Sequence, residues 1–242
     1  MREWAGKRYW LIGASEGLGR SLAIAMSKTG CQLVLSARNE ERLTALASEL
    51  PGRAEVKPLD VGDAAAVEQA AAELGEIDGM IYLAGVYWPI DAKAWDTAQA
   101  EAMCDINMMG AIRSVGAVLP AMLARGSGHI VLTGSLSGFR GLPGAVGYGA
   151  SKAGLMSLAE TMRFDLRGTG VDVQLANPGF IRTRLTDKND FKMPFIMEPD
   201  DAAQSMMDLM NTDRFNVSYP WAFASFFRLS QFMPNWLYYR IF

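Results

Sequence analysis

Short apolar runs alternate along the chain with longer segments in which apolar residues recur every three or four positions. The short runs predict strands, and the longer segments predict helices. A regular alternation of strand and helix is typical of a parallel sheet wound on both faces. We therefore expect one α/β domain over residues 1–242 with about seven strands, at 8–12, 32–36, 54–59, 77–84, 129–133, 171–176 and 214–218. Ligands of such a sheet bind beyond the carboxyl ends of its strands.

Composition narrows the classes of partner. Half of the 242 residues are apolar, and the formal net charge is −3 with no basic block, so we expect no nucleic-acid partner. The two cysteines, Cys31 and Cys104, lie far apart and provide no disulfide framework, which favours the reducing cytoplasm. The single histidine, His129, has no neighbouring His or Cys with which to share a metal, and we expect no metal site.

A glycine-rich turn follows the first predicted strand. It reads Gly13-Ala14-Ser15-Glu16-Gly17-Leu18-Gly19 and leads into a helical segment. Such a turn lets backbone amides approach a pyrophosphate, and the helix N-terminus favours the negative charge. The spacing differs from G-x-G-x-x-G, and no Gly-Lys-Ser/Thr follows, which excludes a P-loop. The pattern predicts a Rossmann-like dinucleotide fold, although a tight strand–helix connection without a ligand would read the same way.

The end of the second predicted strand bears on the choice of dinucleotide. An acidic residue that binds the adenosine ribose 2′-hydroxyl is expected about 20 residues after the turn. Ala37 stands there, followed by Arg38, with Arg42 one helical turn further. The absence of an acidic residue and the presence of a guanidinium group suit a 2′-phosphate, which favours NADP(H) over NAD(H). Glu16 in the turn argues against this, and the alternative is that both arginines begin a solvated helix.

Tyr148 and Lys152 stand four residues apart in a predicted helix, so they share one face. A free phenol titrates near pH ~10, and an ammonium one turn away lowers that pKa, which makes proton exchange feasible. Ser135, thirteen residues upstream, provides a second hydroxyl that could reach the same substrate oxygen. Taken alone, the pair also fits an ordinary aromatic residue beside a solvated lysine.

Taken together, these features resemble the short-chain dehydrogenase/reductase family over about residues 8–183. The resemblance implies an NADP(H)-dependent oxidoreductase that interconverts a carbonyl group and an alcohol on a small to medium apolar substrate. A non-catalytic dinucleotide-binding or scaffold protein acting through the C-terminal tail is the alternative. The positions that carry the resemblance are Gly13, Gly17, Gly19, Asp60, Ala84, Gly85, Asn107, Ser135, Tyr148, Lys152, Pro178, Gly179 and Thr183.

The resemblance also implies a role for each site residue. Tyr148 would be the general acid/base, Ser135 would hydrogen-bond the substrate oxygen, and Lys152 would lower the tyrosine pKa and hold the nicotinamide ribose. Asn107 would hold a water that connects Lys152 to solvent. The cofactor would be bound by Gly13, Ser15, Glu16, Gly17, Leu18, Gly19, Arg38, Asp60, Val61, Ala84, Gly85, Tyr148, Lys152, Pro178, Gly179, Ile181 and Thr183.

Several positions depart from the family pattern. Ile12 stands where threonine is usual, and Tyr82 and Leu83 replace asparagines, so we expect an apolar contact in place of a polar tie. Gly134 replaces the first of two serines. In the predicted helix 95–125, Pro120 predicts a bend or break, whereas Asn107 by local sequence alone reads as a cap or a solvent-facing residue.

The last quarter of the chain lies beyond the family motifs. Residues 185–211 are expected to form a lid whose Met and Phe side chains favour an apolar or bulky substrate. The aromatic-rich extension 221–242 is interrupted by Arg228, Pro234 and Arg240, too often for a membrane span. It could pack on its own domain or a partner subunit, wall the substrate pocket, or lie on a membrane surface. By resemblance, a homodimer would form through the Asn107 and Tyr148 helices.

Overall fold

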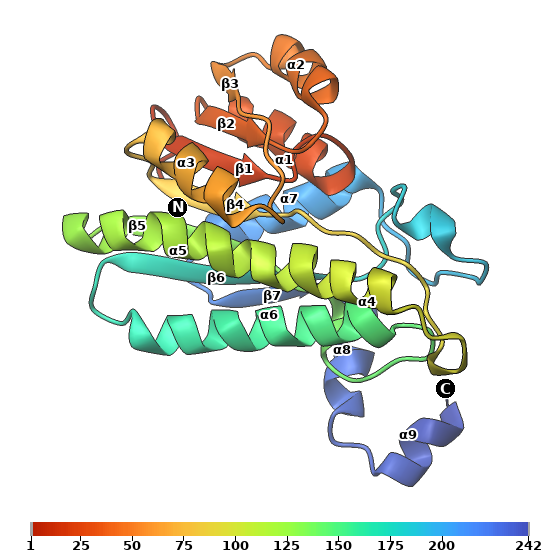
Figure 1. Ribbon diagram of the computed structural model, residues 1–242. Coiled ribbons are helices and arrows are strands. Elements are labelled where there is room, and N and C mark those ends of the chain that lie inside the picture. Colours follow the sequence, from red (N-terminus) through yellow and green to blue (C-terminus); the bar gives the residue numbers. More distant parts are fainter. Residues whose placement is uncertain (1, 242) are drawn as a thin grey trace.

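The computed structural model describes residues 2–241 and contains a seven-stranded, all-parallel sheet (Figure 1). The strand order is β3-β2-β1-β4-β5-β6-β7, so the chain winds outward from β1 in both directions. This confirms the predicted doubly wound Rossmann-like fold. The strands are β1 (Arg8–Ile12), β2 (Gln32–Ser36), β3 (Ala54–Val56), β4 (Gly79–Tyr82), β5 (Gly128–Thr133), β6 (Val171–Pro178) and β7 (Asn216–Tyr219).

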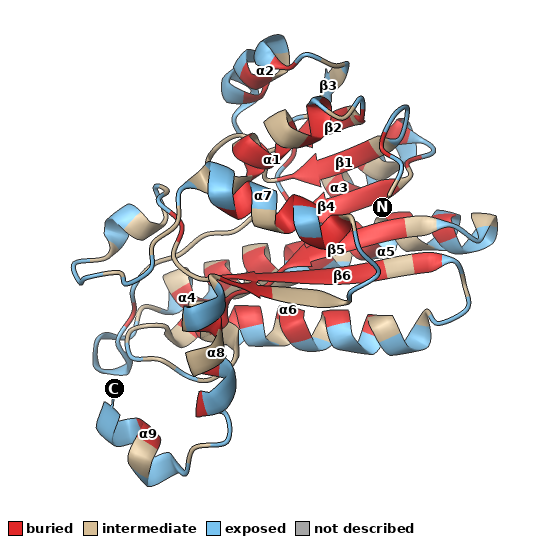
Figure 2. Cartoon of the chain, turned by 180° about the vertical axis from the view of Figure 1, so that it is seen from behind, coloured by how far each residue is buried: buried red, intermediate tan, exposed pale blue. Residues whose placement is uncertain are grey.

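Helices cover both faces of the sheet and bury the strands between them, as Figure 2 shows. One apolar core lies between the sheet and the helices α1, α2 and α7, and the other lies against α3, α5 and α6. Because both strand faces are covered, the strands read as continuous apolar runs. The helices are α1 (Gly17–Ser27), α2 (Glu40–Glu49), α3 (Ala64–Leu74), α4 (Thr97–Cys104), α5 (Gly110–Arg125), α6 (Val146–Asp165), α7 (Pro199–Met210), α8 (Trp221–Ser230) and α9 (Asn235–Ile241).

Two strands end earlier than the sequence predicts. β3 ends at Val56 and β4 at Tyr82, whereas the apolar runs continue to Leu59 and Ala84. Beyond β3 the backbone still bonds to the neighbouring segment, from Lys57 N to Leu35 O at 2.9 Å and from Leu59 N to Ala37 O at 3.0 Å. Residues 83–85 leave the sheet to border the site at its edge, and an apolar run cannot distinguish such an extended loop from a strand.

The predicted helix 95–125 is divided at a different place from the one expected. A π-helical segment, Asp105–Met109, separates α4 from α5, and Pro120 lies inside an uninterrupted α5. The sequence predicts a bend or break at Pro120, and α5 does not break there. By length and composition alone Thr97–Arg125 could cross a membrane, yet here it forms part of the helical layer over the sheet.

The C-terminal quarter divides into parts with different roles. Helix α7 packs against α1 and belongs to the core, so only residues 185–198 remain as the predicted lid. Helices α8 and α9 lie beside the N-terminal end of α6, away from the sheet (Figure 1). Tyr238 Oη donates to Gly141 O at 2.7 Å, and Arg140 Nη1 donates to Met233 O at 2.9 Å. The extension therefore packs on its own domain.

Candidate functional site

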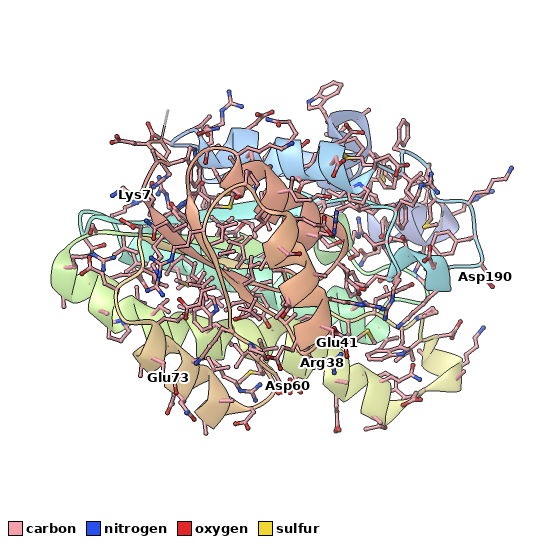
Figure 3. All side chains as sticks on the ribbon, turned by 90° about the horizontal axis from the view of Figure 1, so that it is seen from above. Lys7, Arg38, Glu41, Asp60, Glu73 and Asp190 are labelled. Atoms are coloured by element: carbon pink, nitrogen blue, oxygen red, sulfur yellow. The ribbon has the colours of Figure 1, made fainter. Side chains whose placement is uncertain are left out.

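A cavity of about 400 Å³ lies where the carboxyl ends of β1, β2, β4, β5 and β6 meet. Every residue that the sequence predicts to hold the cofactor lines this cavity. Tyr148 and Lys152 lie at one end, and Arg38 and Asp60 lie at the other, where Figure 3 labels both side chains. Ser135 and Asn107 do not line it: Ser135 lies in a neighbouring cavity, and Asn107 is buried behind the wall.

The glycine-rich turn leaves room that any side chain would fill. Gly13 has φ +95°, and a Cβ there would lie 2.4 Å from Ala84 N. A Cβ on Gly19 would lie 2.0 Å from Gly13 O, and one on Gly17 would lie 2.7 Å from Thr183 Cγ2. Helix α1 begins at this turn without a side-chain cap, so its first N–H groups face the cavity end. The cradle fits the pyrophosphate of a dinucleotide.

Three arginines surround the end of the cavity beside β2. Glu16 accepts from Arg42 Nη1 at 2.6 Å and from Arg184 Nη1 at 3.1 Å. Its carboxylate is thus shared between two cations, while Arg38 adds a third positive charge to the same lining. The negative charge of Glu16, which would repel a phosphate, is therefore neutralised. This end of the cavity has an excess of positive charge.

Two serines organise the hydroxyl at the end of β5. Ser135 Oγ accepts from Ser137 Oγ at 2.9 Å and from Ser137 N at 3.2 Å. With both acceptor positions occupied, the Ser135 proton is directed away from Ser137. Tyr148 shares a hydrogen bond with Ser135, and the ring of Tyr87 lies edge-on to the Tyr148 ring with 5.1 Å between centroids. Sequence reasoning missed Ser137, for which the Ser-Leu-Ser spacing was the available signal.

The titration of the Tyr148–Lys152 pair differs from the expectation. Burial raises the pKa of Tyr148 to about 12, and the hydrogen bond with Ser135 opposes that rise. Burial also lowers the pKa of Lys152 to about 8. Lys152 Nζ donates to Thr133 O at 2.8 Å and lies 5.7 Å from the Tyr148 ring centroid. In the protein without cofactor, burial is the largest influence on the pKa of Tyr148, and Lys152 is not among the groups that shift it.

Asn107 lies in the π-helical segment and is completely buried, so the cap and solvent-facing interpretations are wrong. Its Oδ1 accepts from Val86 N at 2.7 Å, and its Nδ2 donates to Val86 O at 3.0 Å. The same Nδ2 donates to Ser151 Oγ at 3.0 Å. A Cβ on Gly85 would lie 3.4 Å from Asn107 Oδ1 and 3.9 Å from Lys152 Nζ. Asn107 therefore fixes the loop after β4 against α6, close to the lysine.

A second cavity of about 130 Å³ adjoins the first, and Tyr148 lines both. Ser135 and Ser137 supply hydroxyls to it, and Phe180, Phe223 and Phe227 supply aromatic walls. No charged side chain of residues 2–241 lines this cavity. Because α8 contributes two of the phenylalanines, the C-terminal extension walls the cavity as well as packing on the domain. The sequence offered this role as one of three, and it could not select these two residues because aromatic residues occur along the whole segment.

Comparison with known proteins agrees with this geometry. The family model described as short chain dehydrogenase matches residues 7–193. An uncharacterized oxidoreductase of Myxococcus xanthus is 38% identical over 245 residues, covering 98% of this chain and 97% of that protein. Sulfoacetaldehyde reductase 2 of Chromohalobacter salexigens is 39% identical over 184 residues, or 73% of each chain. A short-chain dehydrogenase from Sphingobium yanoikuyae, solved in complex with NADPH, superimposes with a TM-score of 0.82 at 26% identity, covering 95% and 97% of the two chains.

Proposed function

Since the chain belongs to the short-chain dehydrogenase/reductase family of NAD(P)-dependent oxidoreductases, we propose that it interconverts an apolar carbonyl compound and its alcohol with NADP(H). The observation that carries the proposal is the position of Tyr148 between two cavities. One cavity has the glycine cradle and the arginines for a dinucleotide, and the other is apolar with hydroxyls at its Tyr148 end. A non-catalytic binding protein has no need of a second cavity that meets the first at a tyrosine.

The chemistry divides between cofactor and protein. When bound, NADPH supplies the hydride that forms the new C–H bond at the carbonyl carbon. The π electrons of the carbonyl move to oxygen, and Tyr148 gives that oxygen its proton; at neutral pH the phenol holds this proton because its pKa is about 12. Ser135, whose proton points away from Ser137, donates a hydrogen bond to the same oxygen as charge develops. In alcohol oxidation the same residues act in reverse.

The arginines beside β2 support NADP(H) over NAD(H). The 2′-phosphate carries a charge that guanidinium groups bind in bidentate geometry. Three arginines line this end of the cavity against two carboxylates, Glu16 and Asp60. The acid that would instead bind a free 2′-hydroxyl is absent after β2, where Ala37 stands. The NADPH complex of the Sphingobium protein agrees with this choice.

The second cavity supports a neutral, apolar substrate. Its walls are aromatic and aliphatic, and its polar groups are hydroxyls together with the Asn189 amide. The name of the Chromohalobacter relative points to a sulfonated aldehyde, whose negative charge would find no cation among the residues that line this cavity. We therefore propose aliphatic or aromatic ketones and aldehydes without a charged group.

We test the proposal by calorimetric titration with NADPH and NADH, followed by NADPH oxidation with neutral ketones and aldehydes beside sulfoacetaldehyde. Arg38→Asp should weaken binding of NADPH more than that of NADH. Tyr148→Phe should retain NADPH binding and lose on the order of 10²–10⁴ in kcat. No turnover of any carbonyl compound despite NADPH binding would favour the non-catalytic alternative, and a near wild-type kcat for Tyr148→Phe would refute its role.

We also propose that the enzyme is a cytoplasmic homodimer joined through α4–α5 and α6. Ile112, Leu123 and Phe164 project from these helices as exposed apolar side chains. Covering such side chains with a second copy removes apolar area from water. The molar mass of the protein, measured by light scattering after size-exclusion chromatography, tests the dimer. Phe164→Glu should shift the molar mass toward that of a monomer, because it places a charge in the proposed interface.

A further inference from the structure

An unusual stripe of large apolar side chains faces solvent on the C-terminal extension. On α8, Trp221 is 80% exposed, and Leu229 lies two turns further on the same helical face. Just after α8, Phe232 is 86% exposed, and on α9 Trp236 and Tyr239 are 70% and 74% exposed. Figure 2 shows the outer parts of both helices as exposed surface at the edge of the molecule. We call these five residues the aromatic face.

Helix α8 is apolar on both sides, which distinguishes the aromatic face from ordinary surface. Its inner side is already satisfied, because Ala224 and Phe227 are buried in a cluster with Leu136. A helix that packs on a domain by one side normally presents polar residues on the other. Large exposed apolar side chains gathered on one short segment mark a candidate site of interaction with a protein or a membrane.

The charges of the extension indicate the partner. Among residues 221–242 the charged side chains are Arg228 and Arg240, with no Asp or Glu, although the chain as a whole carries −3. Within residues 2–241 neither arginine is in a salt bridge with a carboxylate. The extension is thus a locally cationic, aromatic surface on an acidic protein, and its complement is apolar with negative charge at its border.

We propose that the aromatic face docks on the surface of an anionic lipid bilayer. Interfacial helices combine Trp, Phe and Leu on one side with Arg or Lys beside them, and Trp and Tyr keep their polar tips at the headgroup level. A second copy of the chain fits less well, because the extension brings two arginines and no Asp or Glu to a symmetric pairing.

Docking there would place the membrane against the wall of the substrate cavity. Phe223 and Phe227, which line that cavity, belong to the same helix as Trp221 and Leu229. A neutral apolar carbonyl compound partitions into lipid, so the bilayer would hold the substrate beside the wall that separates it from Tyr148. This consequence rests on the proposed function, whereas the docking itself does not.

The test is co-sedimentation of the full chain with vesicles of phosphatidylcholine alone and of phosphatidylcholine mixed with phosphatidylglycerol. Wild-type protein should bind the mixed vesicles more strongly. Phe232→Glu should lower the partition coefficient on the order of tenfold, and Arg240→Gln should lower the preference for anionic vesicles about fivefold. Ala45→Glu is the control, because it adds the same charge at an exposed position of α2, which lies at the opposite end of the molecule from α8 and α9 (Figure 1). It should bind vesicles like the wild type.

Three outcomes would overturn the proposal. Wild-type protein that sediments with neither vesicle has no membrane site, and Phe232→Glu that binds like wild type places the site elsewhere. Self-association of the wild type that Phe232→Glu abolishes would show that a second copy covers the face. NADPH oxidation by Phe232→Glu with a water-soluble ketone should stay at the wild-type rate, so loss of docking and loss of catalysis are read separately.

Discussion

The hydroxyl of Tyr82 donates a hydrogen bond to the carbonyl of Ile106, with 2.5 Å between the oxygens. This bond joins the end of β4 to the π-helical segment that carries Asn107. The Tyr82 ring meanwhile lies in the same apolar core as Ile12. The sequence predicts that an apolar contact replaces the polar contact usual at this place. Tyr82 does supply an apolar ring, and its hydroxyl also makes a new hydrogen bond.

Removing that hydroxyl should destabilise the fold. Tyr82→Phe leaves a partly buried carbonyl of the π-helical segment without its side-chain donor, which costs about 1–3 kcal/mol. For a chain of this size that loss corresponds to a fall in melting temperature of about 2–4 °C per kcal/mol. Thermal unfolding measures it, with Tyr239→Phe as the control because that hydroxyl is in solvent. Equal melting temperatures for both variants would contradict the structural role of the bond.

Two glycines of α5 should respond to alanine in opposite directions. A Cβ on Gly110 would lie 2.3 Å from Tyr82 Oη and 2.8 Å from Val61 Cγ2, so Gly110→Ala should lose roughly 1–3 kcal/mol. A Cβ on Gly116, in the same helix, meets nothing within 4 Å. Gly116→Ala should therefore gain up to about 1 kcal/mol from helix propensity. Chemical denaturation of both variants checks the difference in sign, and a gain at both positions would refute the crowding at Gly110.

Local spacing made part of the site predictable. The glycine turn and the Tyr148–Lys152 pair depend on neighbours within one turn, so the sequence alone places them on the right elements. Asn107 is different: its burial depends on the π-helical segment, which Tyr82 and Val86 hold from elsewhere in the chain. The direction of the tyrosine pKa shift depends on burial in the folded state, which spacing cannot report. Likewise, the sequence of α8 is apolar on both sides of the helix, so it does not indicate which side packs on the domain.

Ser137 should act as a positioning residue for the Ser135 hydroxyl. Ser137→Ala removes the 2.9 Å bond to Ser135 Oγ and leaves the backbone bond at 3.2 Å. The freed Ser135 hydroxyl would lose its direction, so kcat should fall on the order of tenfold. The dissociation constant for NADPH should not change, because Ser137 does not line the dinucleotide cavity. Ser137→Thr, which keeps a hydroxyl, should recover most of kcat; failure of that rescue would indicate a packing role instead.

Lys152 should reduce stability at neutral pH in the protein without cofactor. Burial lowers its pKa from 10.5 to about 8, so the folded state binds fewer protons than the unfolded state between these values. The stability of the wild type therefore gains, relative to Lys152→Met, as pH rises from about 8 to 10.5. The gain should approach roughly 3 kcal/mol. Denaturation of both proteins across this range measures it, and a constant difference would mean that Lys152 titrates normally.

The stability effects of substitutions at Gly134 and Asn177 should be coupled. A Cβ on Gly134 would lie 2.1 Å from Asn177 Oδ1, so Gly134→Ser, which restores the serine usual in the family, should lose about 1–3 kcal/mol. Asn177 Oδ1 is buried and has no hydrogen-bond partner among the described residues. Shortening that side chain in Asn177→Ser should make room for the new serine, and the double variant should recover most of the loss.

A double-mutant cycle on unfolding free energies separates this coupling from two independent effects. Residues in contact show interaction energies of about 0.5–3 kcal/mol, and a value in that range with the sign of a rescue is expected for this pair. Gly141→Ser provides the control, because a Cβ at Gly141 meets nothing within 4 Å and should be indifferent to Asn177→Ser. Additive losses for Gly134→Ser and Asn177→Ser would mean that the loss in Gly134→Ser does not come from contact with the Asn177 side chain. The glycine would then reflect some need other than room for the asparagine.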